Sequence, residues 1–187
     1  MKKNIILLFA IIFVCSSCEK EINPFLISKQ NIGHLTDSTQ VKDLQSVFEN
    51  DSIYKYISGD EFTGNTNDIE IYEKGGNQLL VLSPSQSLDS TSTIRTVKVI
   101  DSRFTTSKGI NPNSTFKNIK DNYKISNIQN TLRNIIVSVN EINAYFTIDK
   151  NELPANMRFD MNLKIEAIQI PDNAKIKNYF IYWSKNH

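Results

Sequence analysis

Side chains that could catalyse a reaction are few in this chain. The sequence holds two cysteines and two histidines, His34 and His187. Because His187 is the last residue, a nucleophile–histidine–acid triad would depend on His34, which we interpret as a polar loop residue ahead of a helix. No cluster of histidines and cysteines has metal-ligand spacing, and no P-loop, dinucleotide-binding or EF-hand motif occurs. The sequence therefore predicts neither a metal nor a cofactor.

Carboxylates are the remaining candidates for acid–base chemistry. Asp149 with Glu152, and Asp160 with Glu166, lie near a predicted loop and could converge there. No motif around either pair holds the carboxyl groups in position, and acidic residues are mostly exposed in proteins. We therefore expect a protein without catalytic activity, and we keep an enzyme that uses carboxylates as the alternative.

The N-terminal segment predicts where the protein works. Lys2 and Lys3 precede an apolar run at 5–14, which is too short for a membrane-spanning helix of about 20 residues. A basic start followed by a short apolar run is typical of a secretory signal. The next residues, Ser16-Ser17-Cys18, resemble the lipobox of bacterial lipoproteins, with Cys15 where Leu, Ile or Val is usual.

This resemblance implies a lipid anchor. Signal peptidase II would remove residues 1–17, and Cys18 would carry diacylglycerol at the start of a short tether, residues 18–24. We expect the mature protein on the outer membrane, on its periplasmic or surface-exposed face. Its partners would be the membrane, through the lipid on Cys18, and an envelope protein. The alternative enzyme would act on envelope material.

Composition excludes other classes of partner and bond. The chain has 21 basic and 20 acidic side chains, so its charge gives no reason to expect nucleic-acid binding. Cleavage removes Cys15, and acylation consumes the thiol of Cys18, so no disulfide is expected. The fold must therefore be held by its apolar core.

The rest of the chain is predicted to be α+β and mostly antiparallel. Asp37-Ser38-Thr39 supplies oxygens for a helix N-cap. Val41, Leu44 and Phe48 follow at i, i+3 and i+7, the spacing of an amphipathic helix of about ten residues. Strands are expected at 53–57, 69–72, 78–82 and 94–100, with a hairpin at Gly75-Gly76.

The same order of features recurs in the second half of the chain. At the start of each half, residue 25 matches 104, 33 matches 109, and the hydroxyl pair 38–39 matches 114–115. The helix face at 41, 44 and 48 matches 116, 119 and 123, and the first hairpin matches strands at 135–139 and 144–148. Near the end of each half, the spacing of 94, 97, 99 and 101 matches that of 165, 168, 170 and 172. We predict two similar units, 25–103 and 104–187, each a short helix on a mostly antiparallel sheet of about four strands. Leu44 and Ile119 should then both be buried. The alternative is a single domain whose elements merely look alike.

Tandem units of this kind resemble the beta-lactamase inhibitory protein, and single units resemble the outer-membrane assembly lipoproteins SmpA and OmlA. The resemblance implies a binding or scaffold role. This chain lacks the cysteine pairs of the inhibitory protein, so inhibition of beta-lactamase is not implied.

Residues 109–115 are the best-defined local motif. Its glycine, proline and hydroxyl residues could hold an anion at a helix N-terminus. We favour the other interpretation, a turn followed by a helix cap at Ser114 or Thr115.

Two further segments carry unusual apolar residues. The loop 149–161 contains Leu153, Met157, Phe159 and Met161, which either cap the core or bind a partner. We favour the interpretation that the loop caps the core. If it binds a partner instead, these four residues are the partner-binding candidates. The strand 179–183 is apolar on both faces, so one face should join the core and the other should be covered or present aromatic rings to a ligand.

Overall fold

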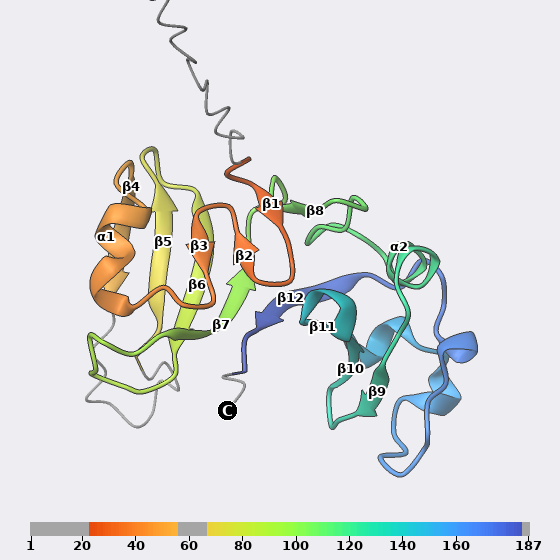
Figure 1. The fold of residues 1–187 in the computed structure, drawn as a ribbon. Coiled ribbons are helices and arrows are strands. Elements are labelled where there is room, and N and C mark those ends of the chain that lie inside the picture. The colour runs from red at the N-terminus through yellow and green to blue at the C-terminus, as the bar shows by residue number, and fades with distance from the viewer. Residues whose placement is uncertain (1–22, 56–66, 185–187) are drawn as a thin grey trace, which may run out of the picture.

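A computed structural model describes residues 23–55 and 67–184 (Figure 1). Two sheets are present, an eight-stranded one in the order β4-β5-β6-β7-β12-β11-β10-β9 and a four-stranded one in the order β3-β2-β1-β8. The large sheet consists of β4 (Asp51–Lys55), β5 (Ile69–Glu73), β6 (Gln78–Pro84), β7 (Ile94–Val99), β9 (Asn127–Asn130), β10 (Asn134–Val139), β11 (Ala144–Asp149) and β12 (Ile176–Tyr182). The small sheet consists of β1 (Leu26–Ile27), β2 (Asn31–Ile32), β3 (Leu35–Thr36) and β8 (Thr105–Thr106).

The helical elements are short. They are α1 (Leu44–Val47), α2 (Phe116–Asn122) and the 3-10 turns η1 (Val41–Asp43), η2 (Asn140–Ile142), η3 (Lys150–Glu152), η4 (Ala155–Met157) and η5 (Ala167–Gln169). The predicted α+β class with mostly antiparallel strands is confirmed. None of the helices in the described part of the chain could span a membrane, because none is both long and apolar enough.

The large sheet corrects the prediction of two separate sheets. Strands β7 and β12, the last strand of each half of the chain, pair antiparallel, with Val97 opposite Ile181. All eight strands therefore form one sheet. Two separate sheets would each leave an edge strand with unpaired backbone N–H and C=O groups, and pairing β7 with β12 satisfies both edges at once. Backbone bonds depend little on side-chain identity, so the sequence pattern carries no signal for this junction.

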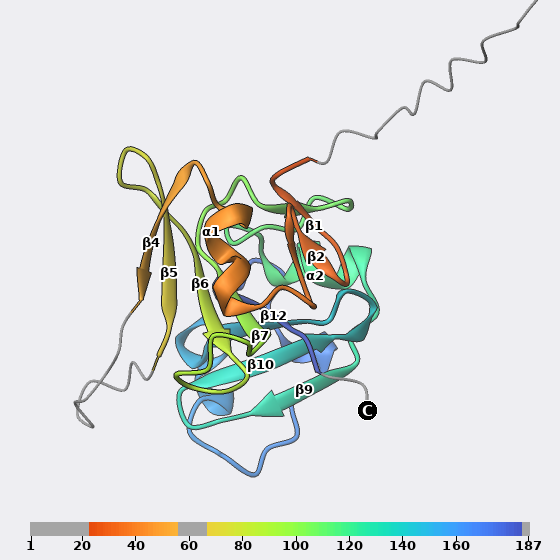
Figure 2. The ribbon, with the colours of Figure 1, turned by 60° about the vertical axis from the view of Figure 1, so that its left-hand side comes forward.

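One face of the large sheet is buried. A row of residues that lie opposite one another on neighbouring strands crosses it, namely Ile71, Leu80, Val99, Tyr179, Phe146 and Val137. The helices α1 and α2 and the small sheet lie over this face (Figures 1 and 2). Leu44 and Ile119 are fully buried there, as predicted from the helix spacing.

The first helix is shorter than predicted. Instead of about ten residues, it has one 3-10 turn, η1, followed by the four-residue α1. Ser46, Val47 and Phe48 all have weaker helix propensity than alanine or leucine, and Ser46 Oγ donates a hydrogen bond back to the Asp43 carbonyl. Burial of Leu44, rather than intrinsic propensity, therefore holds this turn in place.

The hairpins agree with their sequence signals. Strands β5 and β6 are joined through Gly75 and Gly76, whose φ angles of 127° and 100° suit glycine. Strands β10 and β11 were predicted at 135–139 and 144–148, and they pair antiparallel from Asn134–Asp149 to Val139–Ala144. Asn143, with φ 51°, closes the turn between them.

The C-terminal part of the repeat pattern is wrong. Residues 165–172 form η5 and loops, not the strand equivalent to β7. Ile168 is 86% exposed, whereas its supposed counterpart Val97 is fully buried. Strand β12 occupies the position expected for that strand, and the first six residues of β12 have the same order of buried and exposed side chains as β7.

Candidate functional site

The second face of the large sheet is open. No element in the described ranges packs on it, because α1, α2 and the small sheet all lie on the buried side (Figure 2). Side chains on this open face form a row across all eight strands: Tyr54, Glu70, Val81, Lys98, Phe180, Tyr145, Ser138 and Asn127. None of these residues is buried. The open face therefore extends across all eight strands.

Aromatic rings gather in two groups on the open face. Near the β4 edge, Tyr54 and Tyr72 meet edge to face, with ring centroids 5.4 Å apart. Near the centre, Tyr145 stacks on Phe180 with centroids 4.7 Å apart and planes at 13°. Tyr182, on the same face as Phe180, is 44% exposed. These pairs are rigid amphipathic contacts of the kind that proteins use to bind one another.

Polar groups lie beside the aromatic rings on the open face. Burial raises the pKa of the Tyr145 phenol, and the nearby Tyr182 raises it further, so Tyr145 stays a hydrogen-bond donor at neutral pH. The Tyr72 hydroxyl donates to Glu70 Oε2 over 2.7 Å. Lys98 lies directly opposite Phe180. This combination can bind and orient a polar surface.

The strand at 179–183 was expected to use both of its faces. Tyr179 and Ile181 are fully buried, which confirms that one face joins the core. Phe180 and Tyr182 project on the open face. This favours presentation of their aromatic rings to a ligand over cover by neighbouring structure. Tyr54, Tyr72 and Tyr145 were not identified from the sequence. The alternation of β11 does indicate that Tyr145 lies on the other face of the sheet from its buried neighbours Ala144 and Phe146.

The predicted partner residues of the loop 149–161 separate into two kinds. Leu153 and Met157 are 1% and 5% exposed and pack in the core with Phe116, so their assignment to partner binding is wrong. Phe159 and Met161 are 89% and 48% exposed. The core is filled from the η3 and η4 turns, which point Leu153 and Met157 inward, while the chain beyond η4 runs over the surface.

Residues 109–115 form a structural cap. Gly109 has φ 79°, and the Asn118 side chain accepts a hydrogen bond from the Thr115 backbone N–H over 2.8 Å. The first backbone N–H groups of α2, those of Phe116 and Lys117, donate to carbonyl oxygens of 172–174. Because these donors are already bonded, the cap interpretation agrees with the structure and the anion-binding one does not.

Three carboxylates of the two candidate pairs have partners outside their own pair. Asp149 is bound by Lys177 Nζ at 2.8 Å, and this hydrogen bond lowers the pKa of the Asp149 carboxyl. Glu152 accepts from the backbone N–H of Lys175. Asp160 accepts from the N–H of Asn162 instead. Within 23–55 and 67–184, no group of three His, Cys, Asp or Glu side chains could hold a metal. Cys18, the predicted lipidation site, lies outside the described residues.

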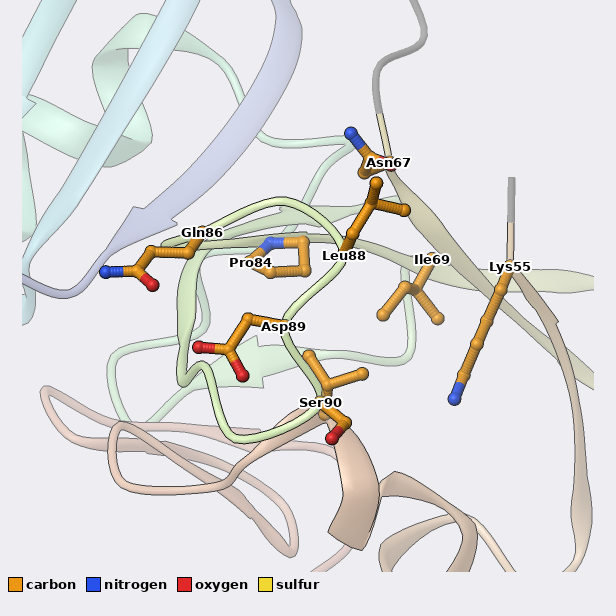
Figure 3. A pocket seen from close by; sticks show the side chains of 9 residues that line it. Lys55, Asn67, Ile69, Pro84, Gln86, Leu88, Asp89 and Ser90 are labelled. Atoms are coloured by element: carbon orange, nitrogen blue, oxygen red, sulfur yellow. The ribbon is translucent and has the colours of Figure 1, made fainter. Parts of the chain in front are cut away.

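A small apolar pocket lies beside the loop that joins β6 to β7. The volume of the pocket is about 210 Å³. Ile69 is one of its lining residues and lies between Lys55 and Asp89 in the view of Figure 3. Hydrogen bonds from the N–H groups of Val41 and Lys42 to the carbonyls of Ser92 and Ser90 hold the loop against η1. The pocket is smaller than the roughly 300–1,000 Å³ usual for small-molecule sites, so it fits one apolar side chain better than a cofactor.

The site and fold together define an α+β protein with an eight-stranded antiparallel sheet, which the described residues cover on one face only. The sequence matches no protein-family model and no curated protein. Among solved structures, the crystal structure of the uncharacterised protein yfeY from Escherichia coli is similar, with a TM-score of 0.52 and 16% sequence identity. The match covers 84% of this chain and 99% of that chain. At this identity the likeness concerns the fold alone.

Proposed function

We propose that this chain is a lipid-anchored protein of the cell envelope that binds a partner protein on the open face of its large sheet and has no catalytic activity. The aromatic groups on that face are the observation that supports the proposal most directly. Tyrosine and phenylalanine are enriched in protein interfaces, where they bring large contact areas at a low cost in conformational entropy. Tyr182, Tyr54 and the Tyr145–Phe180 stack are the expected anchors.

The dimensions and rigidity of the open face fit this role. Eight strands about 4.8 Å apart give a surface on the order of 30 Å across, comparable with a standard protein interface of about 800 Å² per partner. Because the backbone of the sheet is held by ladders of hydrogen bonds, binding does not require the ordering of a loop. A preorganised surface loses less free energy on association.

The proposed repeat explains why the aromatic residues form two groups. In this interpretation, units 25–103 and 104–187 have fused their sheets side by side. Two isolated bridges support it: Gln40, just before η1, pairs with Thr93, and Thr115, just before α2, pairs with Lys175. In both cases the partner residue directly precedes the last strand of its unit. Each unit then contributes one aromatic pair to the open face.

The lipid anchor is proposed from Ser16-Ser17-Cys18, which resembles a bacterial lipobox. The described chain begins at Asn23, next to β1, at one end of the molecule (Figure 1). An anchor there would leave the large sheet extending away from the membrane, where a partner in the envelope could reach its open face.

Photo-crosslinking in cells tests the proposed surface. A benzophenone amino acid placed at Tyr182 or at Tyr54 should give a discrete covalent adduct. The same probe at Lys117, an exposed residue of α2 on the other side of the sheet, is the matched control and should give none. Absence of an adduct from both open-face positions, or the same adduct from Lys117, would contradict the proposal.

A further inference from the structure

A basic pocket lies at the end of the molecule opposite β1, where the β9–β10 turn meets the end of β11 (Figures 1 and 2). Its volume is about 270 Å³, and its walls include Arg133, Lys150, Arg158, Asp149, Leu132 and Phe159. The Lys150 backbone N–H donates to the Arg133 carbonyl over 3.0 Å. Two of the basic residues are therefore fixed side by side on neighbouring strand ends.

The charge of this pocket is not balanced by its own residues. Asp149 is the acidic residue of the wall, and its carboxylate is already bound by Lys177 Nζ, at 2.8 Å. Arg158 Nε donates to the Leu153 carbonyl over 2.8 Å, which holds its side chain in place. Among the described residues, no group bonds to the terminal nitrogens of Arg158 or to the guanidinium of Arg133. Guanidinium groups placed in this way are suited to bind a carboxylate or a phosphate.

Lys150 provides an independent sign of a missing ligand. The residue is only 5% exposed, and its Nζ is buried without a hydrogen-bond partner among the described residues. Lysines are almost never buried unless they are paired, because an isolated buried charge is strongly disfavoured. Because Lys150 lines the pocket, an anion bound there would offset this buried positive charge.

The rim of the pocket is apolar. Leu132 and Phe159 are 71% and 89% exposed, although both are large hydrophobic side chains. Asn130 holds the segment after Phe159 in place, since its side-chain amide donates to the Asp160 and Leu163 carbonyls over 2.9 and 3.0 Å. A ligand that fits must therefore carry an apolar group directly beside its negative charge.

We propose that this pocket binds the C-terminal carboxylate of a partner polypeptide that ends in an apolar residue. Arg133 and Arg158 would bind the carboxylate, the buried charge of Lys150 would add to their attraction, and Leu132 and Phe159 would lie against the side chain. Capture of a chain terminus by clustered donors is a known mode of peptide recognition. A lipid headgroup offers related chemistry. The choice of a polypeptide rests on the proposed anchor at Cys18, because the pocket lies at the end of the molecule away from β1, where the described chain begins.

Binding of a minimal probe tests the site. The full chain carrying Cys18→Ser is titrated with N-acetyl-leucyl-phenylalanine and with its C-terminal amide, and Kd is measured by NMR shift changes. The acid should bind at least about tenfold more tightly than the amide, since removal of the charge leaves the basic groups unpaired. Equal binding of the acid and the amide, or no binding of the acid, would overturn the proposal.

Variants then locate the site. Lys150→Met and Arg158→Gln should each weaken binding of the acid about tenfold or more, whereas Lys74→Met, at an exposed residue of the β5–β6 hairpin, should leave it unchanged. Lys150→Met should also keep or raise the melting temperature, because it replaces an unpaired buried amine by an apolar side chain of similar length. Unchanged affinity in both pocket variants would overturn the assignment.

Vesicles of phosphatidylglycerol separate a lipid from a peptide. Binding of the same Cys18→Ser chain to these vesicles, lost in Arg158→Gln, together with no response to the acid, would replace the peptide with a lipid headgroup. The open-face crosslinks use other residues, so failure of this pocket and failure of the proposed partner surface are distinguishable.

Discussion

The rings of Phe25 and Phe104 meet edge to face, with their centroids 5.1 Å apart and their planes at 68°. Each ring directly precedes a short strand, and these strands, β1 and β8, pair in parallel with Leu26 opposite Thr105. The two phenylalanines were matched in sequence as the first landmarks of the two halves. The halves are therefore joined at their starts by the small sheet and at their ends by the β7–β12 pair.

We predict that Phe104→Ala lowers the free energy of unfolding by about 3–5 kcal/mol, because the side chain is 4% exposed and packs in the main core cluster. Chemical denaturation measures this change. Phe159→Ala removes the same atoms from a side chain that is 89% exposed, and should change stability by about 0.5 kcal/mol or less. Similar losses for the two variants would contradict the described packing.

The helix faces give a second prediction. Leu44→Ala in α1 and Ile119→Ala in α2 should each lower the free energy of unfolding by about 2–5 kcal/mol, since both side chains are fully buried. Thermal or urea unfolding measures the effect. Leu88→Ala, at a residue that is 78% exposed, is the control and should change stability little. A loss confined to one helix would show that the two helices do not contribute alike.

Much of the fold could be predicted because it depends on side-chain periodicity. Leu44 and Ile119 follow from helical spacing, and the β5–β6 hairpin follows from Gly75-Gly76. The β7–β12 junction could not be predicted, since it consists of backbone hydrogen bonds that many sequences can form. The spacing of Ile165, Ile168 and Ile170 was misleading because three apolar residues in a loop can match a strand by chance.

The residues of the candidate sites also divide into some that the sequence pattern indicates and others that only the three-dimensional fold brings together. Phe180 and Tyr182 were recognisable in a strand that is apolar on both faces, but Tyr54 and Tyr72 reach the same face only through the strand order. The basic pocket brings together residues from a hairpin turn, a strand end and a loop. Phe159 was identified from the sequence, whereas Arg133 and Lys150 have no local signature that separates them from other surface cations.

The ion pairs of Arg103 predict an acid-dependent loss of stability. Arg103 binds Asp101 and Glu73, each at 2.8 Å, and these hydrogen bonds hold the pKa of both carboxyls below their ordinary values of 3.8 and 4.5. A carboxyl whose pKa is lowered in the folded state stabilises the fold at pH values above its ordinary pKa. This contribution is lost as the pH falls from the ordinary pKa through the lowered one.

Arg103→Met should therefore be less stable than the unmodified chain at pH 7, and the difference should shrink as the pH falls below 4.5 and then 3.8. Part of the loss should persist at low pH, because Arg103 also lies 4.7 Å above the Phe25 ring. Urea unfolding over a pH series measures both parts. Arg95→Met, at an exposed residue of β7, should show no such convergence, and a constant difference for Arg103→Met would refute the pairing.

The lipid anchor is tested by a pair of cysteine variants. Cys18→Ser should abolish incorporation of labelled fatty acid and release the protein from the membrane fraction, because the acylated thiol is gone. Cys15→Ser leaves Cys18 in place and should keep both properties. Continued labelling of Cys18→Ser would rule out the anchor, and loss of labelling in both variants would point to a defect in export instead.

Tyr182 and Trp183 are neighbours in sequence but face opposite sides of the large sheet, and they give the sharpest test of the open face. Trp183 is 4% exposed, and its indole N–H donates to the Lys29 carbonyl over 3.0 Å. Trp183→Ala should therefore lower the free energy of unfolding by about 3–5 kcal/mol. Tyr182→Ala should lower it by about 1 kcal/mol or less, because its ring lies on a solvent-exposed face.

Substitutions at these two positions should also separate binding from folding. A benzophenone probe at Tyr54 should lose most of its adduct in Tyr182→Ala, since truncation of an aromatic anchor costs 2 kcal/mol or more, on the order of a thirtyfold loss in affinity. Trp183→Phe keeps a buried ring and should retain the adduct in the folded fraction. If Tyr182→Ala were fully folded and gave the adduct at its original yield, Tyr182 would be an ordinary exposed side chain, and the partner surface would be confined to the Tyr54–Tyr72 group.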